Sequence, residues 1–189
     1  MRLQPSALKR LQGFFLRLTR QSFSQLGVGD NRIAEYVAEV LTEFGFSDRW
    51  LRMRSADGRR ITSVVEMMVA QLGPDSERRM LDERQFRKYV GDYTLFMSGL
   101  FRGFVERGGH LRYYIDEGRR SYEKVSALDA ALYRPDFLVF EELSKGFEYY
   151  SGALDYMRKC FFAPAPHEDP FAGFLRQIEG WIRTGRSDN

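Results

Sequence analysis

The spacing of apolar residues constrains the fold of this chain more than any other feature of its sequence. In three separate stretches, apolar side chains recur with the period of an α-helix that buries one face. The stripes are Ile33, Val37, Val40, Leu41 and Phe44; Ile61, Val64, Val65, Met68 and Leu72; and Phe171, Phe174, Leu175, Ile178 and Ile182. Only Trp50–Arg54, before the Asp57-Gly58 turn signal, could form a short hairpin, and we interpret it as an irregular connection. The spacing therefore predicts an all-α protein.

The prolines support this interpretation, because all six lie between the patterned stretches. Proline is tolerated at the start of a helix, and Pro74, Pro135 and Pro170 each stand where a helical pattern begins. We expect a single-domain bundle of about six or seven helices. Their expected ranges are 6–25, 31–45, 60–72, 76–107, 111–132, 136–162 and 170–184. Residues 1–162 would form the bundle, and residues 163–189 a proline-rich linker and a C-terminal amphipathic helix.

The composition indicates a folded chain with a large core. Hydrophobic residues make up 43% of the 189 residues, including 16 Phe and 10 Tyr, whereas disordered chains are poor in aromatics. Charged residues interrupt every apolar run before the ~18–20 residues of a membrane span. The single cysteine, Cys160, excludes an intrachain disulfide, and we expect it to be a small buried hydrophobe. A reducing cytoplasm is the location that this cysteine usage favours.

The most apolar stretch, residues 89–109, predicts a helix at the centre of the bundle. Residues 89–105 are apolar around most of a helical wheel, apart from one narrow strip of polar and small residues. The strip contains Lys88, Asp92, Gly99, Arg102, Gly103 and Glu106, with Leu95 as its one large apolar member. Each glycine disfavours a helix by about 1 kcal/mol relative to alanine. Two explanations stay open: Gly99 or Gly103 faces Gly118 of the next helix in a close crossing, or the strip lines a polar ligand niche.

The strip motivates our leading hypothesis, a non-enzymatic binding module for a partner protein or a small anionic ligand. In this hypothesis Arg102 and Arg119 bind a carboxylate or phosphate of the ligand. Tyr114 donates a hydrogen bond to the ligand, and Asp92 orients one of the arginines.

Nucleic-acid association is the alternative hypothesis. Basic residues cluster around one tryptophan, a combination that suits phosphate binding and base stacking. This cluster comprises Arg49, Trp50, Arg52, Arg54, Arg59 and Arg60. The first helix would add a basic face, because the chain has no acidic residue before Asp30. Affinity that falls steeply with salt would support this hypothesis. The sequence leaves open whether the basic helix is a targeting segment or a part of the bundle.

Signatures of catalysis and of cofactor binding are missing from the sequence. It contains no phosphate-binding Gly-rich loop with its lysine, no dinucleotide fingerprint and no nucleophile elbow. Neither His110 nor His167 follows a glutamate at the spacing of a di-iron bundle. Glu35, Glu39 and Glu43 share a helical face opposite the apolar stripe, so we expect them to be solvated. We therefore expect no cofactor and no metal. An enzyme is the third hypothesis, because it would have to use His110 or the tyrosines as acid–base groups without a recognisable nucleophile.

The last helix carries more apolar surface than a free tail would expose to water. Its apolar residues are Phe171, Phe174, Leu175, Ile178, Trp181 and Ile182. Such a surface marks an interface. We expect this helix to dock on its own bundle, and a homodimer that exchanges the helix is the alternative.

Overall fold

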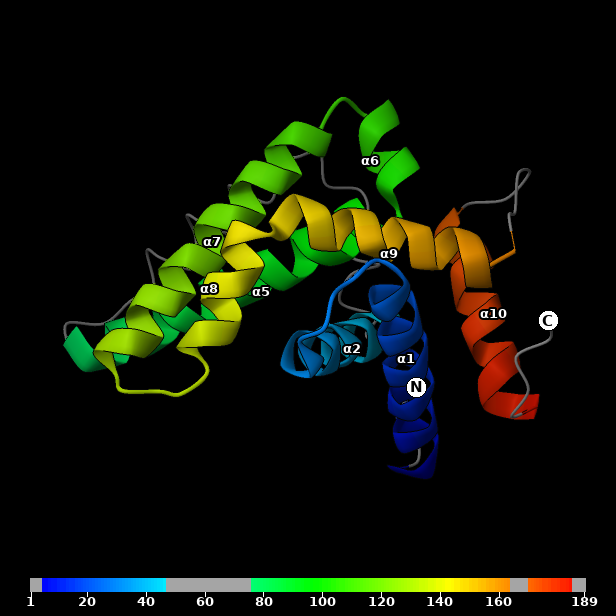
Figure 1. Ribbon diagram of the computed structural model, residues 1–189, viewed down its shortest axis with the longest axis horizontal. Coiled ribbons are helices and arrows are strands. Elements are labelled where there is room, and N and C mark those ends of the chain that lie inside the picture. Colours follow the sequence, from blue (N-terminus) through cyan, green and yellow to red (C-terminus); the bar gives the residue numbers. More distant parts are fainter. Residues whose placement is uncertain (1–4, 47–75, 164–169, 185–189) are drawn as a thin grey trace.

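The computed structural model describes residues 5–46, 76–163 and 170–184. Within these ranges the chain is all-α: every regular element is a helix, as the apolar spacing predicts (Figure 1). The helix expected at 60–72 and the connection at Trp50–Arg54 lie outside the described residues.

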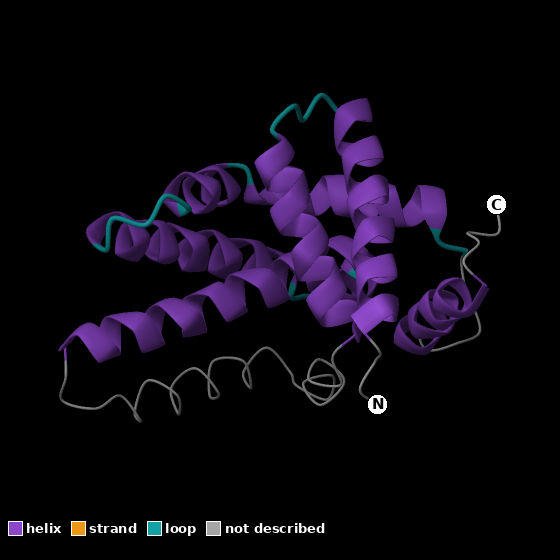
Figure 2. Cartoon of the chain, turned by 90° about the horizontal axis from the view of Figure 1, so that it is seen from below, coloured by secondary structure: helices purple, strands orange, loops and turns teal. Residues whose placement is uncertain are grey.

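The helices form a long arm and a second group at one end of it. The helices are α1 (Pro5–Gln25), α2 (Asn31–Phe46), α5 (Ser76–Leu100), α6 (Arg102–Arg107), α7 (Leu111–Ala131), α8 (Phe137–Lys145), α9 (Phe147–Phe161) and α10 (Pro170–Thr184). In the arm, α7 packs against both α5 and α8. In the second group, α1 packs against α2, α9 and α10 (Figures 1 and 2). In the part of the chain that the structure describes, no helix is long and apolar enough to span a membrane.

The central helix is α5, as expected from residues 89–105. Every residue from Val90 to Phe101 is buried, because α5 packs against α2, α7 and α9. The ring of Phe96 stacks on Phe44 of α2 at 5.3 Å between centroids and meets Phe174 of α10 at 6.1 Å. The helix α5 therefore packs against helices of both the arm and the second group.

Two stretches that we expected to be single helices are each broken. The stretch 76–107 divides at Phe101, whose φ of −114° and ψ of 28° leave the helical region. The break accompanies the packing of the Phe101 ring against Phe171 at 4.3 Å and Phe174 at 5.4 Å. The stretch 136–162 divides at Gly146, with φ −100° and ψ 16°. A Cβ at Gly146 would lie 2.7 Å from the Tyr150 ring, so the close approach of that ring requires glycine here.

The glycines of the central stretch are explained by packing, although not by the crossing that we expected. A Cβ at Gly99 would lie 2.6 Å from Leu154 Cβ of α9. A Cβ at Gly118 would lie 2.1 Å from Phe147 Cζ of α9 and 2.7 Å from Thr94 Oγ1 of α5. Gly103 is exposed. The expectation that Gly118 faces Gly99 or Gly103 is therefore wrong, because larger side chains fill the space beside each buried glycine.

The last helix docks on its own bundle, as expected. Phe171, Phe174 and Ile178 of α10 are buried, and Phe174 stacks on Phe162 at 5.1 Å between ring centroids. The side chains of Trp181 and Ile182 lie outside the described part of the molecule. A homodimer through this helix stays a prediction.

The turn between α7 and α8 places a tyrosine where glycine is usual. Arg134 N–H donates to Asp129 O at 2.8 Å, and Tyr133 N–H donates to Ala130 O at 3.2 Å. These two bonds define a Schellman motif, whose first residue after the cap adopts a left-handed conformation. That residue is Tyr133, with φ of 53° and a side chain that is 96% exposed. Its backbone is strained, and its side chain makes little contact in return.

We expect Tyr133→Gly to raise the free energy of unfolding by about 1 kcal/mol, since glycine adopts the left-handed conformation without the strain of a Cβ. Chemical denaturation of the variant and of Tyr133→Ala would measure this gain. The alanine variant retains the strain and should match the parent protein. Equal stabilities of the glycine and alanine variants would contradict the prediction.

Candidate functional site

The residues that we predicted to bind a ligand lie in different surroundings. Asp92 is buried between helices, and Arg102 donates to Ser151 Oγ of α9 at 3.3 Å. Tyr114 is buried beside Tyr93, with 6.1 Å between ring centroids. Arg119 is exposed and lines a groove between α7 and α8. Each of the four residues therefore has its own set of neighbours, and ligand binding by any of them stays a prediction.

Asp92 is the centre of a buried polar network that joins three helices. One of its carboxylate oxygens, Oδ1, accepts hydrogen bonds from Tyr36 of α2 at 2.5 Å and from Tyr122 of α7 at 2.9 Å. The other, Oδ2, accepts from Lys88 Nζ at 2.7 Å, and this ammonium group also lies 5.0 Å from the Tyr36 ring centroid. Both oxygens are thus satisfied by protein groups. This arrangement fits a structural role for Asp92.

A second buried carboxylate, Asp129 of α7, pairs with Arg84, which lies on α5 one turn before Lys88. Arg84 binds Asp129 of α7 through two hydrogen bonds, of which the one from Nη2 to Oδ2 is 2.8 Å long. Asp129 is fully buried, and the Arg84 guanidinium lies 5.7 Å from the Phe140 ring centroid. The strip of α5 therefore contacts neighbouring helices along this part of its length.

The two tyrosines that bind Asp92 have perturbed acidities. Burial, followed by the charge of Asp92, raises the pKa of Tyr36 and of Tyr122 well above the ordinary value of 10.0. Both phenols therefore stay protonated in the folded state and act as hydrogen-bond donors.

These pKa shifts predict a loss of stability in alkali. The unfolded chain releases a proton from each tyrosine above about pH 10, whereas the folded chain retains it, so stability falls by about 1.4 kcal/mol per pH unit for each such tyrosine. We expect Tyr122→Phe to reduce the slope of unfolding free energy against pH by about that amount. Denaturation with urea between about pH 9 and 12 would measure it. Equal slopes for the variant and the parent would contradict the assignment.

The groove that contains Arg119 is the candidate site. It has a volume of about 450 Å³ and lies between α7 and α8. This size is within the range of small-molecule pockets. Nine side chains line it: Arg119, Glu123, Ser126, Ala127, Ala130, Phe137, Glu141, Ser144 and Lys145. Sequence reasoning found only Arg119, because the other wall belongs to α8 and depends on how the two helices pack.

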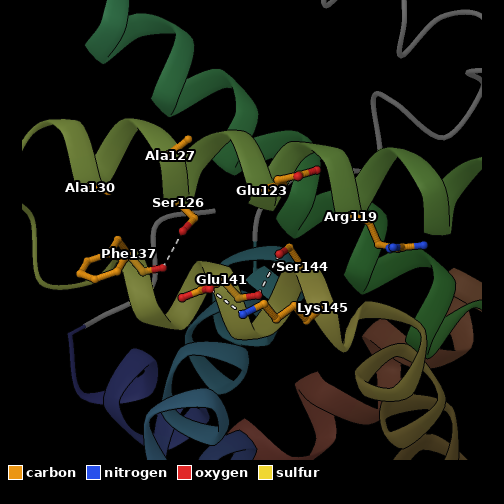
Figure 3. A pocket seen from close by; sticks show the side chains of 9 residues that line it. All are labelled: Arg119, Glu123, Ser126, Ala127, Ala130, Phe137, Glu141, Ser144 and Lys145. Atoms are coloured by element: carbon orange, nitrogen blue, oxygen red, sulfur yellow. Dashed lines mark hydrogen bonds and ion pairs between the residues drawn. The ribbon is translucent and has the colours of Figure 1, made fainter.

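The two ends of the groove differ in chemistry (Figure 3). Arg119 and Lys145 lie toward one end, and Ala130 and Phe137 lie toward the other. Lys145 Nζ is paired with Glu141 Oε1 at 2.5 Å. Among the residues that the structure describes, Arg119 makes no ion pair. The groove can therefore offer a free guanidinium at one end and an apolar surface at the other.

The residues of the nucleic-acid hypothesis are described only in part. The cluster Arg49, Trp50, Arg52, Arg54, Arg59 and Arg60 lies outside the described residues. The basic face belongs to α1, which packs into the bundle through Leu11, Phe15 and Leu18. Lys9, Arg10, Arg17 and Arg20 are exposed on it, and Arg20 pairs with Glu35 at 2.6 Å. The hypothesis stays a prediction.

The remaining candidate residues have different outcomes. Glu35, Glu39 and Glu43 are exposed, as expected. Cys160 is exposed rather than buried, because it follows the exposed Tyr156 by one turn on the outer face of α9. No group of three or more His, Cys, Asp or Glu side chains in the described ranges could hold a metal ion.

Comparison with known proteins adds no relative: no protein-family model, curated protein or solved structure matches this chain.

Proposed function

We propose that this protein is a non-enzymatic binding module whose groove between α7 and α8 takes a small organic anion with an apolar portion. One observation carries the proposal: the groove, of about 450 Å³, contains an arginine that has no ion pair with any described residue. A guanidinium binds carboxylate or phosphate through two parallel hydrogen bonds. The apolar portion of the ligand would rest against Ala130 and Phe137.

A location, an oligomeric state and a second candidate function are proposed from other observations. A cytoplasmic location rests on the single cysteine. A homodimer through α10 rests on the apolar character of that helix. Nucleic-acid association remains the second candidate, supported by the exposed cations of α1. We place it second because the described part of that surface holds few cations and one of them, Arg20, is already paired.

Arg119→Ala tests the proposal with 3-phenylpropionate, a carboxylate that carries an apolar ring, as the probe. We expect the variant to bind this probe at least about tenfold more weakly than the parent, since a hydrogen bond to a charged group contributes about 1.5–3 kcal/mol. A titration followed by nuclear magnetic resonance would give both dissociation constants.

The neighbouring arginine provides the matched control. Arg120 is also exposed on α7, but it pairs with Glu117 at 3.5 Å and does not line the groove. We expect Arg120→Ala to bind the probe like the parent. Equal weakening in both variants would indicate a general effect of charge and would contradict a site at Arg119.

A further inference from the structure

In this structure both serine hydroxyls of the groove donate their hydrogen within the protein and offer a ligand only their acceptor capacity. Ser126 Oγ donates to Phe137 O at 2.9 Å, and Ser144 Oγ donates to Glu141 O at 2.8 Å (Figure 3). A hydroxyl has one hydrogen and two lone pairs, so each oxygen retains only its accepting capacity. The wall of the groove is therefore suited to a ligand group that donates hydrogen bonds.

Glu123 adds a negative charge to the same wall. It follows Arg119 by one helical turn, a spacing at which the Cβ atoms are about 5–6 Å apart. Glu123 lines the groove, and within the described ranges it makes no ion pair with Arg119 or with another residue. An arginine that precedes a glutamate by one turn is the less favourable order for an ion pair within a helix. Both charges are thus available to a ligand.

The facing helix, α8, offers no free charge that could pair with Arg119 or Glu123. The charged side chains of the groove that belong to α8 are Glu141 and Lys145, and they neutralise one another at 2.5 Å. The available charges are then one cation at Arg119 and one anion at Glu123, with acceptor oxygens at Ser126 and Ser144.

We propose that the ligand of this groove is a zwitterion, a free α-amino acid with an apolar side chain. Its carboxylate would bind Arg119, its ammonium group would donate to Glu123 and to a serine oxygen, and its side chain would lie toward Phe137. This inference rests on the proposed function, which requires only the anionic group. It adds a positive group on the ligand and assigns Glu123 to recognise it.

Three probes with the same phenyl skeleton test the inference: L-phenylalanine, 3-phenylpropionate without the ammonium group, and 2-phenylethylamine without the carboxylate. Their dissociation constants are measured by nuclear magnetic resonance titration on the full-length parent protein and on the Glu123→Gln variant. We expect L-phenylalanine to bind the full chain at least about tenfold more tightly than either analogue, the ratio that one charge-assisted hydrogen bond provides. Glu123→Gln should abolish its advantage over 3-phenylpropionate without changing the affinity for 3-phenylpropionate.

The control variant is Glu39→Gln, an exposed carboxylate of α2 that does not line the groove. It should retain the preference for L-phenylalanine. If 3-phenylpropionate binds as tightly as L-phenylalanine, the inference is wrong while the proposed function stands. If none of the three probes binds, both are wrong. If Glu123→Gln retains the preference, the assignment of the ammonium group to Glu123 is overturned.

Discussion

Asp92→Ala is expected to lower the free energy of unfolding by about 3 kcal/mol, because removing one member of a buried charged network leaves its partners unsatisfied. Tyr122 is fully buried and loses the acceptor of its hydroxyl, which lies 2.9 Å from Asp92 Oδ1. Lys88, with 30% of its side chain exposed, can turn toward water, so its loss is smaller. Chemical denaturation followed by circular dichroism would measure the change.

Asp116→Ala is the matched control for this experiment. Asp116 also pairs with a basic residue one turn away on its own helix, Arg112 at 3.1 Å, but the pair is exposed to solvent. Exposed pairs contribute little, so we expect a change within about 0.5 kcal/mol. If Asp92→Ala destabilises the protein no more than Asp116→Ala does, the network does not hold the three helices together.

Gly118→Ala is expected to be destabilising by about 2 kcal/mol, although alanine is the better helix former. The added Cβ would lie 2.1 Å from Phe147 Cζ and 2.7 Å from Thr94 Oγ1. Phe147 and Thr94 are both fully buried, so neither can turn out into solvent. The helices α7 and α9 would have to separate, which strains the core.

Gly13→Ala is the control with the opposite expected sign. Gly13 is exposed within α1, and a Cβ there would meet no atom within 4 Å. We expect a gain of about 0.5–1 kcal/mol from the higher helix propensity of alanine and the lower entropy of the unfolded chain. A similar gain in Gly118→Ala, measured by the same denaturation, would show that α9 does not pack closely on Gly118.

The sequence was informative about the fold where the signal is local. Pro170 marks the first residue of α10, and Phe171, Phe174 and Ile178 of its helical stripe are buried as predicted, with Leu175 partly buried. The breaks at Phe101 and Gly146 were not predictable in this way, because one non-helical residue hardly disturbs the apolar period around it. They depend on which rings pack against them in the folded chain.

The Asp92 network and the groove also depend on contacts between helices that the sequence pattern does not predict. Asp92 could be identified as a polar exception on an apolar helix, but its partners Tyr36 and Tyr122 lie 56 and 30 residues away. Nothing in the sequence around either tyrosine indicates that its hydroxyl binds Asp92. Arg119 was predicted as a cation that binds the ligand, whereas the opposite wall of the groove, with Ser144, exists only because α8 folds back on α7. Sequence periodicity gives the faces of helices but not their neighbours.

Binding of a small organic anion in the groove between α7 and α8 can be followed residue by residue. Amide chemical-shift mapping during titration with 3-phenylpropionate tests it most directly, because each shift reports the position of the ligand along the chain. We expect the largest shifts at residues 119–130 of α7 and 137–145 of α8, and we expect Arg119→Ala to abolish them. Shifts that are absent, or that lie on α1 and survive Arg119→Ala, would contradict this expectation.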